Sequence, residues 1–435
     1  MMSKKKLFQL IGLLLVFSML LVACDEAPPD EVVDDPVDEE VDDPVDEEVD
    51  DPVDEEVEGI TLAINHFSII EGTTWSGAQH RAGERIAEKY DNVNYIYREE
   101  VGPDLTIPFA EEMIADGADI VIGNAEFMGL PLKDIVDQHP DVYFASVVGS
   151  DVTTERNFIR YFPRQYQALY LEGLIAGALT ETNSIGIVSA FPVAQVSRRQ
   201  AGFILGVQEA AELLGKDIDV YVRYAGDWFL PAEEREIATT LVEEYNIDVI
   251  TQQTDSGAPL DVAEERDIWF VGKDMDTVGH YGWSDTSTVA LSFDTRWEVL
   301  FDQMVQDKLA DNPDPETILM LGMESSMELA DGREVYAVDI KNDNNIGLEA
   351  ISPEALPLIE QEVLDLVEER REMMIAGEWD PFTAHELVSN GTGLALEGIP
   401  IPEEGEVVKP AGEEPTAEWL LGSFNFDLLG TTILE

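Results

Sequence analysis

Short runs of β-branched and other apolar residues alternate with amphipathic stretches from Gly59 to about residue 310. The runs have the length of buried strands, and between most of them apolar residues recur every three or four positions, as on helices. The predicted strands are Ile60–Asn65, Val93–Arg98, Asp119–Gly123, Val142–Val148, Ser184–Ser189, Asp219–Tyr224, Asp248–Thr251, Ile268–Gly272 and Val289–Phe293. The predicted helices are Thr74–Tyr90, Thr106–Asp116, Pro131–Gln138, Pro163–Glu181, Val196–Leu214, Pro231–Tyr245, Pro259–Glu265 and Trp297–Leu309. Repeated strand–helix units predict an α/β fold of parallel sheets with helices on both faces.

One segment interrupts the alternation. Asn157–Phe162 is expected to be a short extended crossover, and Pro163 stands where the first position of the next helix is expected. In that helix, Gly173 and Gly177 lie between large apolar residues, which permits close helix packing. Nine strands fit either one wide sheet or two doubly wound lobes joined at this crossover.

Aromatic and acidic residues follow the carboxyl ends of several predicted strands, where ligands of parallel sheets bind. The aromatic residues are Trp75, Phe127, Trp228 and Trp297, and the acids are Asp255, Asp274 and Asp276. Aromatic faces stack on a flat or ring-shaped ligand, and carboxylates accept hydrogen bonds from its hydroxyl or amino groups. The alternatives are core packing for each aromatic residue and helix capping for each acid.

The charge balance excludes one class of partner. The 435 residues include 91 Asp and Glu against 25 Lys and Arg, so the formal net charge is -66. Nucleic acids are bound through clustered Lys and Arg, and we therefore expect no nucleic-acid partner. A hydrophobic content of 45% is nevertheless sufficient for a sizeable folded core.

The N-terminus has the pattern of an export signal. Lys4–Lys6 precede the apolar stretch Leu7–Leu20, which is too short and wrongly flanked for a spanning helix. The following Leu21-Val22-Ala23-Cys24 resembles a bacterial lipobox. This resemblance implies a lipoprotein signal peptide at residues 1–23, acylation of Cys24, and a lipid-anchored location on the extracytoplasmic face of the cell membrane. The alternative for this single cysteine is a buried free thiol.

Residues 24–58 are predicted to form a disordered acidic tether after the acylated cysteine. The octad Val-Asp-Asp-Pro-Val-Asp-Glu-Glu occurs three times, and residues 25–58 hold 20 acids without Lys or Arg. Such a segment repels itself and has no apolar face, so a solvated spacer is favoured over a calcium-binding repeat. The remaining 71 acids lie in the folded part, whose acidic, lysine-poor composition favours a protein adapted to high salt.

Signatures of catalysis and of cofactor binding are missing from the sequence. It contains no GxSxG, HExxH, Walker loop or GxGxxG after a strand, and its five His are dispersed. We therefore expect no enzyme activity, no cofactor and no metal. Paired carboxylates of a surface hydrolase remain the alternative, since acids are abundant.

Four stretches together resemble the basic membrane protein family of extracytoplasmic solute-binding lipoproteins, which includes the purine nucleoside receptors of ABC importers. They are Asn157–Phe162 running into Tyr166–Thr180, then Ile185–Pro192, Gly226–Pro231, and Asp248–Pro259. The resemblance covers nearly all of residues 60–310. It implies a fold like that of type I periplasmic binding proteins, in which two α/β lobes joined by three crossovers close on a ligand in a central cleft.

On this resemblance, lobe 1 comprises residues 59–160 with a return segment at about 283–320, and lobe 2 comprises residues 161–282 with part of 321–435. The implied ligand-binding residues are Trp75, Glu99, Phe127, Trp228, Asp255, Asp274, Asp276 and Trp297. The aromatic residues would hold a purine ring, and the acids would bind ribose hydroxyls or ring N–H groups. Because no lysine lies in Ser292–Trp297, where nucleoside receptors often have one, a nucleobase or another small heterocycle stays open.

The resemblance implies a monomeric protein that captures a purine nucleoside or nucleobase and delivers it to an ABC permease and ATPase complex. Three alternatives remain open at the level of sequence. The same fold could bind a sugar or an amine, it could serve as a ligand-sensing receptor, or the chain could be the surface hydrolase mentioned above.

Overall fold

A computed structural model describes residues 59–71, 73–147, 157–272, 288–312, 315–342 and 345–435. The predicted signal peptide, Cys24, the acidic tether, Asp274 and Asp276 lie outside the described residues. Among the residues that are described, none of the helices has the length and apolar content needed to cross a membrane.

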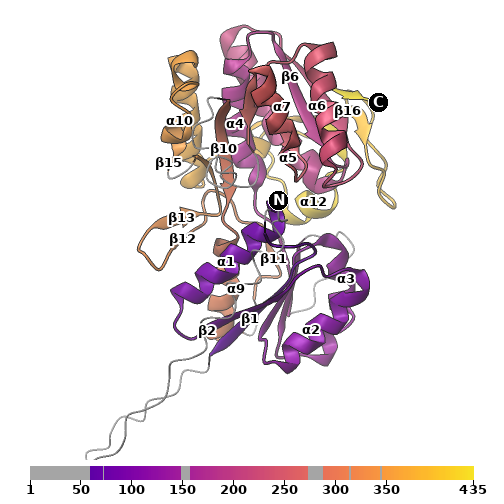
Figure 1. Cartoon of the computed structure of the whole chain (residues 1–435), viewed down its shortest axis with the longest axis vertical. Coiled ribbons are helices and arrows are strands. Elements are labelled where there is room, and N and C mark those ends of the chain that lie inside the picture. Colours follow the sequence, from indigo (N-terminus) through magenta and orange to yellow (C-terminus); the bar gives the residue numbers. More distant parts are fainter. Residues whose placement is uncertain (1–58, 72, 148–156, 273–287, 313–314, 343–344) are drawn as a thin grey trace, which may run out of the picture. The chain divides into compact units, whose positions relative to one another are not determined.

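The first lobe is built on a six-stranded parallel sheet in the order β11-β5-β4-β3-β1-β2. Figure 1 labels β1, β2 and β11 of this sheet. Its strands are β1 (Ile60–Asn65), β2 (Val93–Arg98), β3 (Ile120–Gly123), β4 (Tyr143–Val147), β5 (Phe158–Tyr161) and β11 (Ile318–Leu319). Its helices are α1 (Trp75–Lys89), α2 (Thr106–Ala115), α3 (Gly129–Lys133) and α9 (Trp297–Leu309). Successive residues of β1 point to opposite faces, so Leu62 and Ile64 pack in the core with α1 and α9, whereas Ala63 packs in the core with α2 and α3.

The second lobe is built on an eight-stranded sheet in the order β15-β14-β10-β9-β8-β6-β7-β19. Its strands are β6 (Ser184–Ser189), β7 (Asp219–Tyr224), β8 (Val249–Gln253), β9 (Trp269–Val271), β10 (Val289–Thr295), β14 (Val338–Asn342), β15 (Asn345–Ile346) and β19 (Thr431–Leu434). Helices α6 (Pro231–Tyr245) and α7 (Ala258–Arg266) share a core with Val188 and Ile250, whereas α4 (Gln165–Leu179) and α5 (Ala194–Leu214) share one with Ile185 and Ile187. Only the β10–β14 and β14–β15 pairs of this sheet are antiparallel. The prediction of an α/β fold with parallel sheets is therefore confirmed, and the two-lobed alternative holds over the single wide sheet.

The segment after β11 adds mainly to the second lobe. It contains α10 (Gln361–Ile375), α11 (Pro381–Ala384), α12 (Ala417–Gly422), β12 (Ser326–Glu328), β13 (Glu334–Tyr336), β16 (Leu387–Gly393), β17 (Val407–Lys409) and β18 (Phe426–Leu428). Strands β12 and β13 form a hairpin, β17, β16 and β18 form a small antiparallel sheet, and β19 extends the large sheet by pairing in parallel with β7.

The chain passes between the two sheets three times, after β5, after β10 and after β11. Two sequence predictions differ from this path. Strand β10 pairs with β9 and β14, so the return to the first lobe begins at α9 and not at about residue 283. Asn157–Phe162 contains β5, a buried strand of the first sheet, and α4 begins at Gln165 with Arg164 before it, so Pro163 does not occupy its first position.

Helices α4 and α5 pack backbone to backbone through glycine. A Cβ added at Gly173 would lie 2.0 Å from the carbonyl oxygen of Phe203, and one added at Gly206 would lie 2.0 Å from that of Tyr170. These distances are far below van der Waals contact, so only glycine fits at either position. The close helix packing that the sequence permits at Gly173 is present in the structure.

Candidate functional site

A cavity of about 390 Å³ is lined by side chains from both lobes. The first lobe contributes Phe67, Trp75, Asn124, Ala125, Glu126, Phe127 and Val147, and the second contributes Gln195, Arg199, Trp228 and Asp255. Most of these residues lie at or just after the carboxyl ends of β1, β3, β4, β6, β7 and β8. The position follows the rule for parallel sheets, and the volume is within the range of about 300–1,000 Å³ typical of small-molecule sites.

Trp75 offers the cavity an aromatic ring whose polar atom is already bonded. Its Nε1 donates to the carbonyl oxygen of Asn124 at 2.7 Å. The ring packs edge-on against Trp297, with 5.1 Å between centroids, and lies 6.1 Å from Phe162. Because the indole N–H is satisfied within the protein, this side chain can contribute stacking but no direct hydrogen bond to a bound molecule.

Asn124 holds the first-lobe wall together. Its Oδ1 accepts from the backbone N–H of Phe67 at 2.8 Å, and its Nδ2 lies 3.0 Å from Nδ1 of His66 and 3.2 Å from Ser76 Oγ. Burial, with a further effect from nearby His80, lowers the pKa of His66 to about 3. The imidazole is therefore neutral at physiological pH, and its Nδ1 can accept the amide proton of Asn124.

Trp228 and Asp255 are tied to each other on the second-lobe side. The backbone N–H of Asp255 donates to the carbonyl oxygen of Trp228 at 2.8 Å. The Trp228 ring meets Phe191 at an interplanar angle of 69°, with 5.6 Å between centroids. The loops after β7 and β8 thus form one wall that carries an aromatic face beside a carboxylate.

A hydrogen bond joins the two lobes at this wall. Thr74 Oγ1 donates to Asp255 Oδ1 at 3.3 Å. Thr74 stands at the N-cap of α1, but it is the neighbouring Thr73 whose Oγ1 accepts the N–H of Gly77, at 3.1 Å. The Thr73 hydroxyl therefore caps the N-terminus of α1, and the Thr74 hydroxyl is available to bind the second lobe.

One of two consecutive buried arginines of α5 brings positive charge to the cavity. Arg199 lines it, and Arg198 lies with its guanidinium carbon 4.7 Å from the centroid of the Phe162 ring. Burial lowers the pKa of Arg198 to about 9, so it is still largely protonated at neutral pH. With Asp255 and Glu126 also at the lining, the cavity presents both signs of charge.

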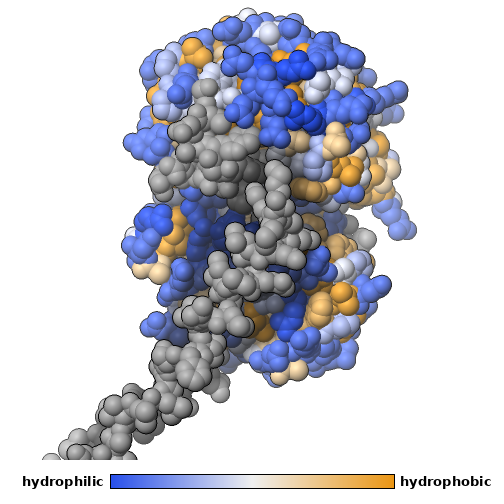
Figure 2. Space-filling model, in the orientation of Figure 1, coloured by the Kyte–Doolittle hydropathy of each residue, from blue (hydrophilic) through white to orange (hydrophobic). Residues whose placement is uncertain are grey.

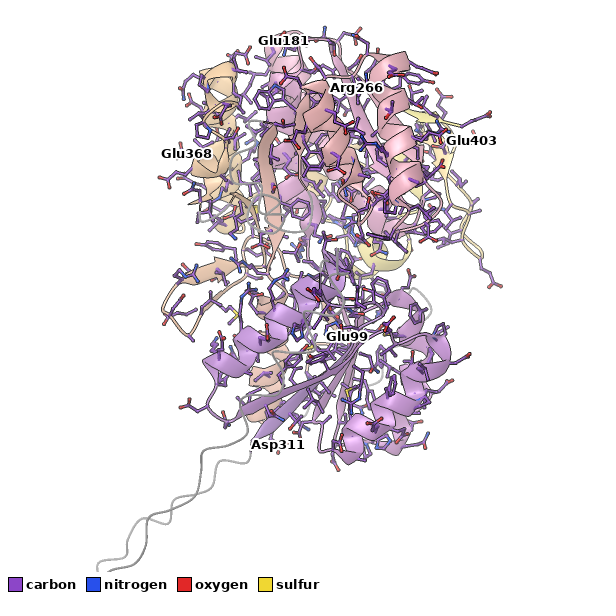
Figure 3. All side chains as sticks on the ribbon, in the orientation of Figure 1. Glu99, Glu181, Arg266, Asp311, Glu368 and Glu403 are labelled. Atoms are coloured by element: carbon purple, nitrogen blue, oxygen red, sulfur yellow. The ribbon has the colours of Figure 1, made fainter. Side chains whose placement is uncertain are left out.

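The structure brings together Trp75, Phe127, Trp228 and Asp255, half of the ligand-binding residues predicted from sequence. Trp297 is only 1% exposed and supports Trp75 from behind. Glu99, labelled in Figure 3, is exposed and accepts the backbone N–H of Ile70 at 2.8 Å, so it shapes the loop after β1. Neither Trp297 nor Glu99 lines the cavity, so the structure does not bring them together with the other four.

Sequence reasoning missed the roles of the remaining seven lining residues. Gln195 and Arg199 are one helical turn apart at the start of α5, directly after β6, so the strand-end rule could have identified them. Both stand on a helix and are neither aromatic nor acidic, unlike the loop residues that the sequence indicated. Within the described residues, no group of three or more His, Cys, Asp or Glu is arranged to hold a metal ion.

Comparisons with known proteins show which proteins this chain is similar to. The chain is 31% identical over 225 residues to a putative ABC transporter glucose-binding protein of Haloferax volcanii, covering 52% of this chain and 56% of that protein. It is 28% identical over 206 residues to a purine-binding protein of Brucella abortus, covering 47% and 57%. The chain thus spans little more than half the length of these relatives.

A solved ABC transporter solute-binding protein from Aeropyrum pernix has the same fold, with a TM-score of 0.58 and 17% identity over 73% of this chain and 92% of that one. Residues 60–326 match the Bmp family, described as ABC transporter substrate-binding protein, PnrA-like. That range holds the whole first lobe, the cavity wall and most of the second sheet. The chain therefore belongs to the Bmp family of PnrA-like ABC transporter substrate-binding proteins.

Proposed function

We propose that this protein is the extracytoplasmic solute-binding component of an ABC importer, and that it captures a purine nucleoside or nucleobase and delivers it to a permease and ATPase complex. The observation that carries the proposal is the cavity between the lobes, with four aromatic side chains and a few polar ones in its lining. Binding stabilises the closed arrangement of the lobes, and the protein releases its solute chemically unchanged.

The composition of the lining supports a flat heterocycle. Four aromatic side chains line the cavity: Phe67, Trp75, Phe127 and Trp228. The indole N–H of Trp75 already donates a hydrogen bond within the protein. Hydrogen bonding thus falls to groups such as Asp255, whose carboxylate accepts from ribose hydroxyls or ring N–H groups. The relative from Brucella abortus, named a purine-binding protein, supports the same ligand class.

A sugar is the second candidate. The relative from Haloferax volcanii is named a putative glucose-binding protein, and aromatic faces together with a carboxylate and a guanidinium also suit a ring bearing hydroxyl groups. The two candidates differ in what they need from the aromatic side chains, because a purine presents two flat π faces, whereas a hexose presents a puckered face of C–H groups with hydroxyl groups around its edge.

A ligand panel tests the proposal. Protein purified without refolding is analysed by mass spectrometry for a retained solute, and thermal shift is measured with adenosine, guanosine, adenine, hypoxanthine, glucose and a cationic amine. At a concentration 100 times Kd, a bound ligand stabilises by about 2.7 kcal/mol and raises the melting temperature. A response to glucose alone would establish the second candidate, and silence from every purine would refute the first.

The hydrogen bond between Thr74 and Asp255 is proposed to act as a closure latch. Thr74→Val removes the hydroxyl and keeps the shape, so we expect ligand dissociation to accelerate about three- to tenfold with little change in association rate. Thr74→Ser keeps the donor and should behave like the wild type. The N-terminus of α1 remains capped by Thr73 in both variants. Equal dissociation rates for the valine and serine variants would contradict the latch.

We propose that the mature chain begins at an acylated Cys24 and is held at the membrane by that lipid, with the acidic tether as a spacer. Cys24→Ser should release the protein from the membrane fraction into the medium or periplasm, because the acyl chains are then absent. Fractionation followed by immunoblotting measures the change. A serine variant that still sediments with membranes would rule out lipid anchoring as the cause.

The folded part is proposed to be adapted to high salt. The visible face is largely hydrophilic (Figure 2), and exposed acids such as Glu181, Asp311, Glu368 and Glu403 project from both lobes (Figure 3). At about 1 M salt the Debye length falls to about 3 Å, which screens their mutual repulsion. We expect the melting temperature to be about 5–10 °C higher in molar KCl than in dilute buffer. Equal melting temperatures in the two solutions would refute this adaptation.

A further inference from the structure

We propose that the C-terminal segment beyond the family match positions the second-lobe wall of the cavity, with Asp427 as the positioning residue. The family match ends at residue 326, and β18, which carries Asp427, lies about a hundred residues further along the chain. The inference concerns how the cavity is built. Its affinity readout rests on the proposed function, whereas its structural readout does not.

A single buried carboxylate connects the two elements that carry the wall. Asp427 is 3% exposed, and its Oδ1 accepts from the hydroxyl of Tyr224 at 2.8 Å and from Ser197 Oγ at 3.4 Å. Tyr224 is the last residue of β7, four positions before Trp228. Ser197 lies in α5 midway between Gln195 and Arg199. Both strand-end elements are thus held by one side chain from outside the matched range.

The carboxylate is itself fixed by its own segment. Thr392 Oγ1 lies 2.8 Å from Asp427 Oδ2 and 2.7 Å from Asn390 Oδ1, and its single proton is shared between these two acceptors. Hydrogen bonds from hydroxyl groups to an ionised carboxylate are shorter and about twice as strong as bonds between neutral groups. Burial nevertheless raises the pKa of Asp427, while the three hydroxyl donors act in the opposite direction.

Further contacts tie the same segment to the cavity side of the second lobe. Arg198, which precedes the lining residue Arg199, donates to the carbonyl oxygen of Leu420 in α12. Phe382 stacks on Tyr166 of α4 with 4.0 Å between ring centroids, and the ring of Phe424 in turn stacks on Phe382, with its centroid 5.5 Å from that of Phe382. Strand β19 also pairs with β7 from Val220 to Arg223. The segment therefore supports the start of α5 and the strand before Trp228 from several sides.

Substitution of Asp427 is expected to loosen this wall specifically. Asp427→Ala removes all three acceptor bonds, and Asp427→Asn keeps the shape but replaces one acceptor oxygen with an NH₂ donor. The matched control is Asn425→Ala, because Asn425 is equally buried and its side chain donates only to the carbonyl oxygens of Ile399 and Pro400 within the same segment.

Two measurements separate positioning from general stability. Hydrogen–deuterium exchange on ligand-free protein should show faster exchange in residues 194–199 and 225–228 for Asp427→Ala, but not for Asn425→Ala. Affinity for adenosine or glucose, whichever the wild type binds, should fall at least about tenfold in Asp427→Ala and less in Asp427→Asn. In combination with Asp427→Ala, Tyr224→Phe should add little further loss, since the two groups share one bond.

The outcomes are distinct for the two proposals. Unchanged exchange in both wall segments of Asp427→Ala, or an equal change in Asn425→Ala, would overturn the positioning role. Binding of neither probe by the wild type would count against the proposed ligands, and the exchange comparison would still decide the role of Asp427.

Discussion

Gly206→Ala is expected to destabilise the second lobe by about 3 kcal/mol or more, at the upper end of the range for overpacked cores. The added Cβ would lie 2.0 Å from the carbonyl oxygen of Tyr170 and 2.8 Å from the backbone nitrogen of Leu174. Both are backbone atoms of α4, so no side-chain rotation can relieve the clash and the two helices must separate. In a helix, alanine is intrinsically favoured over glycine by about 1 kcal/mol. A decrease in stability on Gly206→Ala would therefore be caused by the clash with α4.

Thermal unfolding in molar salt measures the effect, and we expect a drop of about 5 °C or more in the melting temperature. Gly102→Ala is the matched control, because an added Cβ there meets no atom within 4 Å and φ is -77°. That variant should be neutral or slightly stabilised. A melting temperature for Gly206→Ala within 1 °C of that for Gly102→Ala would show that the helices tolerate separation.

The local pattern predicted most elements because buried parallel strands are continuous apolar runs. Strands β1, β2, β6 and β7 and helices α6 and α9 begin and end at the predicted residues. The sheet that each strand joins was harder to predict from the sequence, since it depends on pairing between strands that are distant along the chain. Thus β10 could be recognised as a strand, but its partners β9 and β14 could not be deduced from its own sequence.

The sequence located residues of the cavity lining where a residue's exposure followed from its loop. Trp228 and Asp255 stand in loops after β7 and β8 and line the cavity. Trp297 stands at a similar position, yet it is buried against Trp75, because α9 returns to the first lobe. The net charge of the chain also gave no indication of Arg199, which is a buried cation at the cavity of a strongly acidic protein.

Trp228→Ala and Asp255→Ala are each expected to weaken ligand binding at least tenfold, equivalent to about 1.4 kcal/mol. Loss of the Trp228 ring removes a large stacking surface from the lining, opposite a wall held by the first lobe. Loss of the Asp255 carboxylate removes a hydrogen-bond acceptor from the cavity lining, which we propose serves the ligand, and also removes the acceptor of the Thr74 hydroxyl between the lobes. Asp255→Ala should therefore also accelerate ligand dissociation, because the hydrogen bond from Thr74 between the lobes is lost, whereas Trp228→Ala keeps that bond.

Calorimetric titration with the retained solute measures both affinities. Phe229→Ala and Asp261→Ala are the matched controls, since each removes an exposed aromatic or acidic side chain that lies near in sequence but does not line the cavity. We expect both controls to bind like the wild type. Trp228→Phe should recover part of the affinity, because a smaller ring still stacks, whereas Asp255→Asn should recover little if the ligand donates to both carboxylate oxygens. Wild-type affinity in both alanine variants would place the ligand elsewhere in the protein.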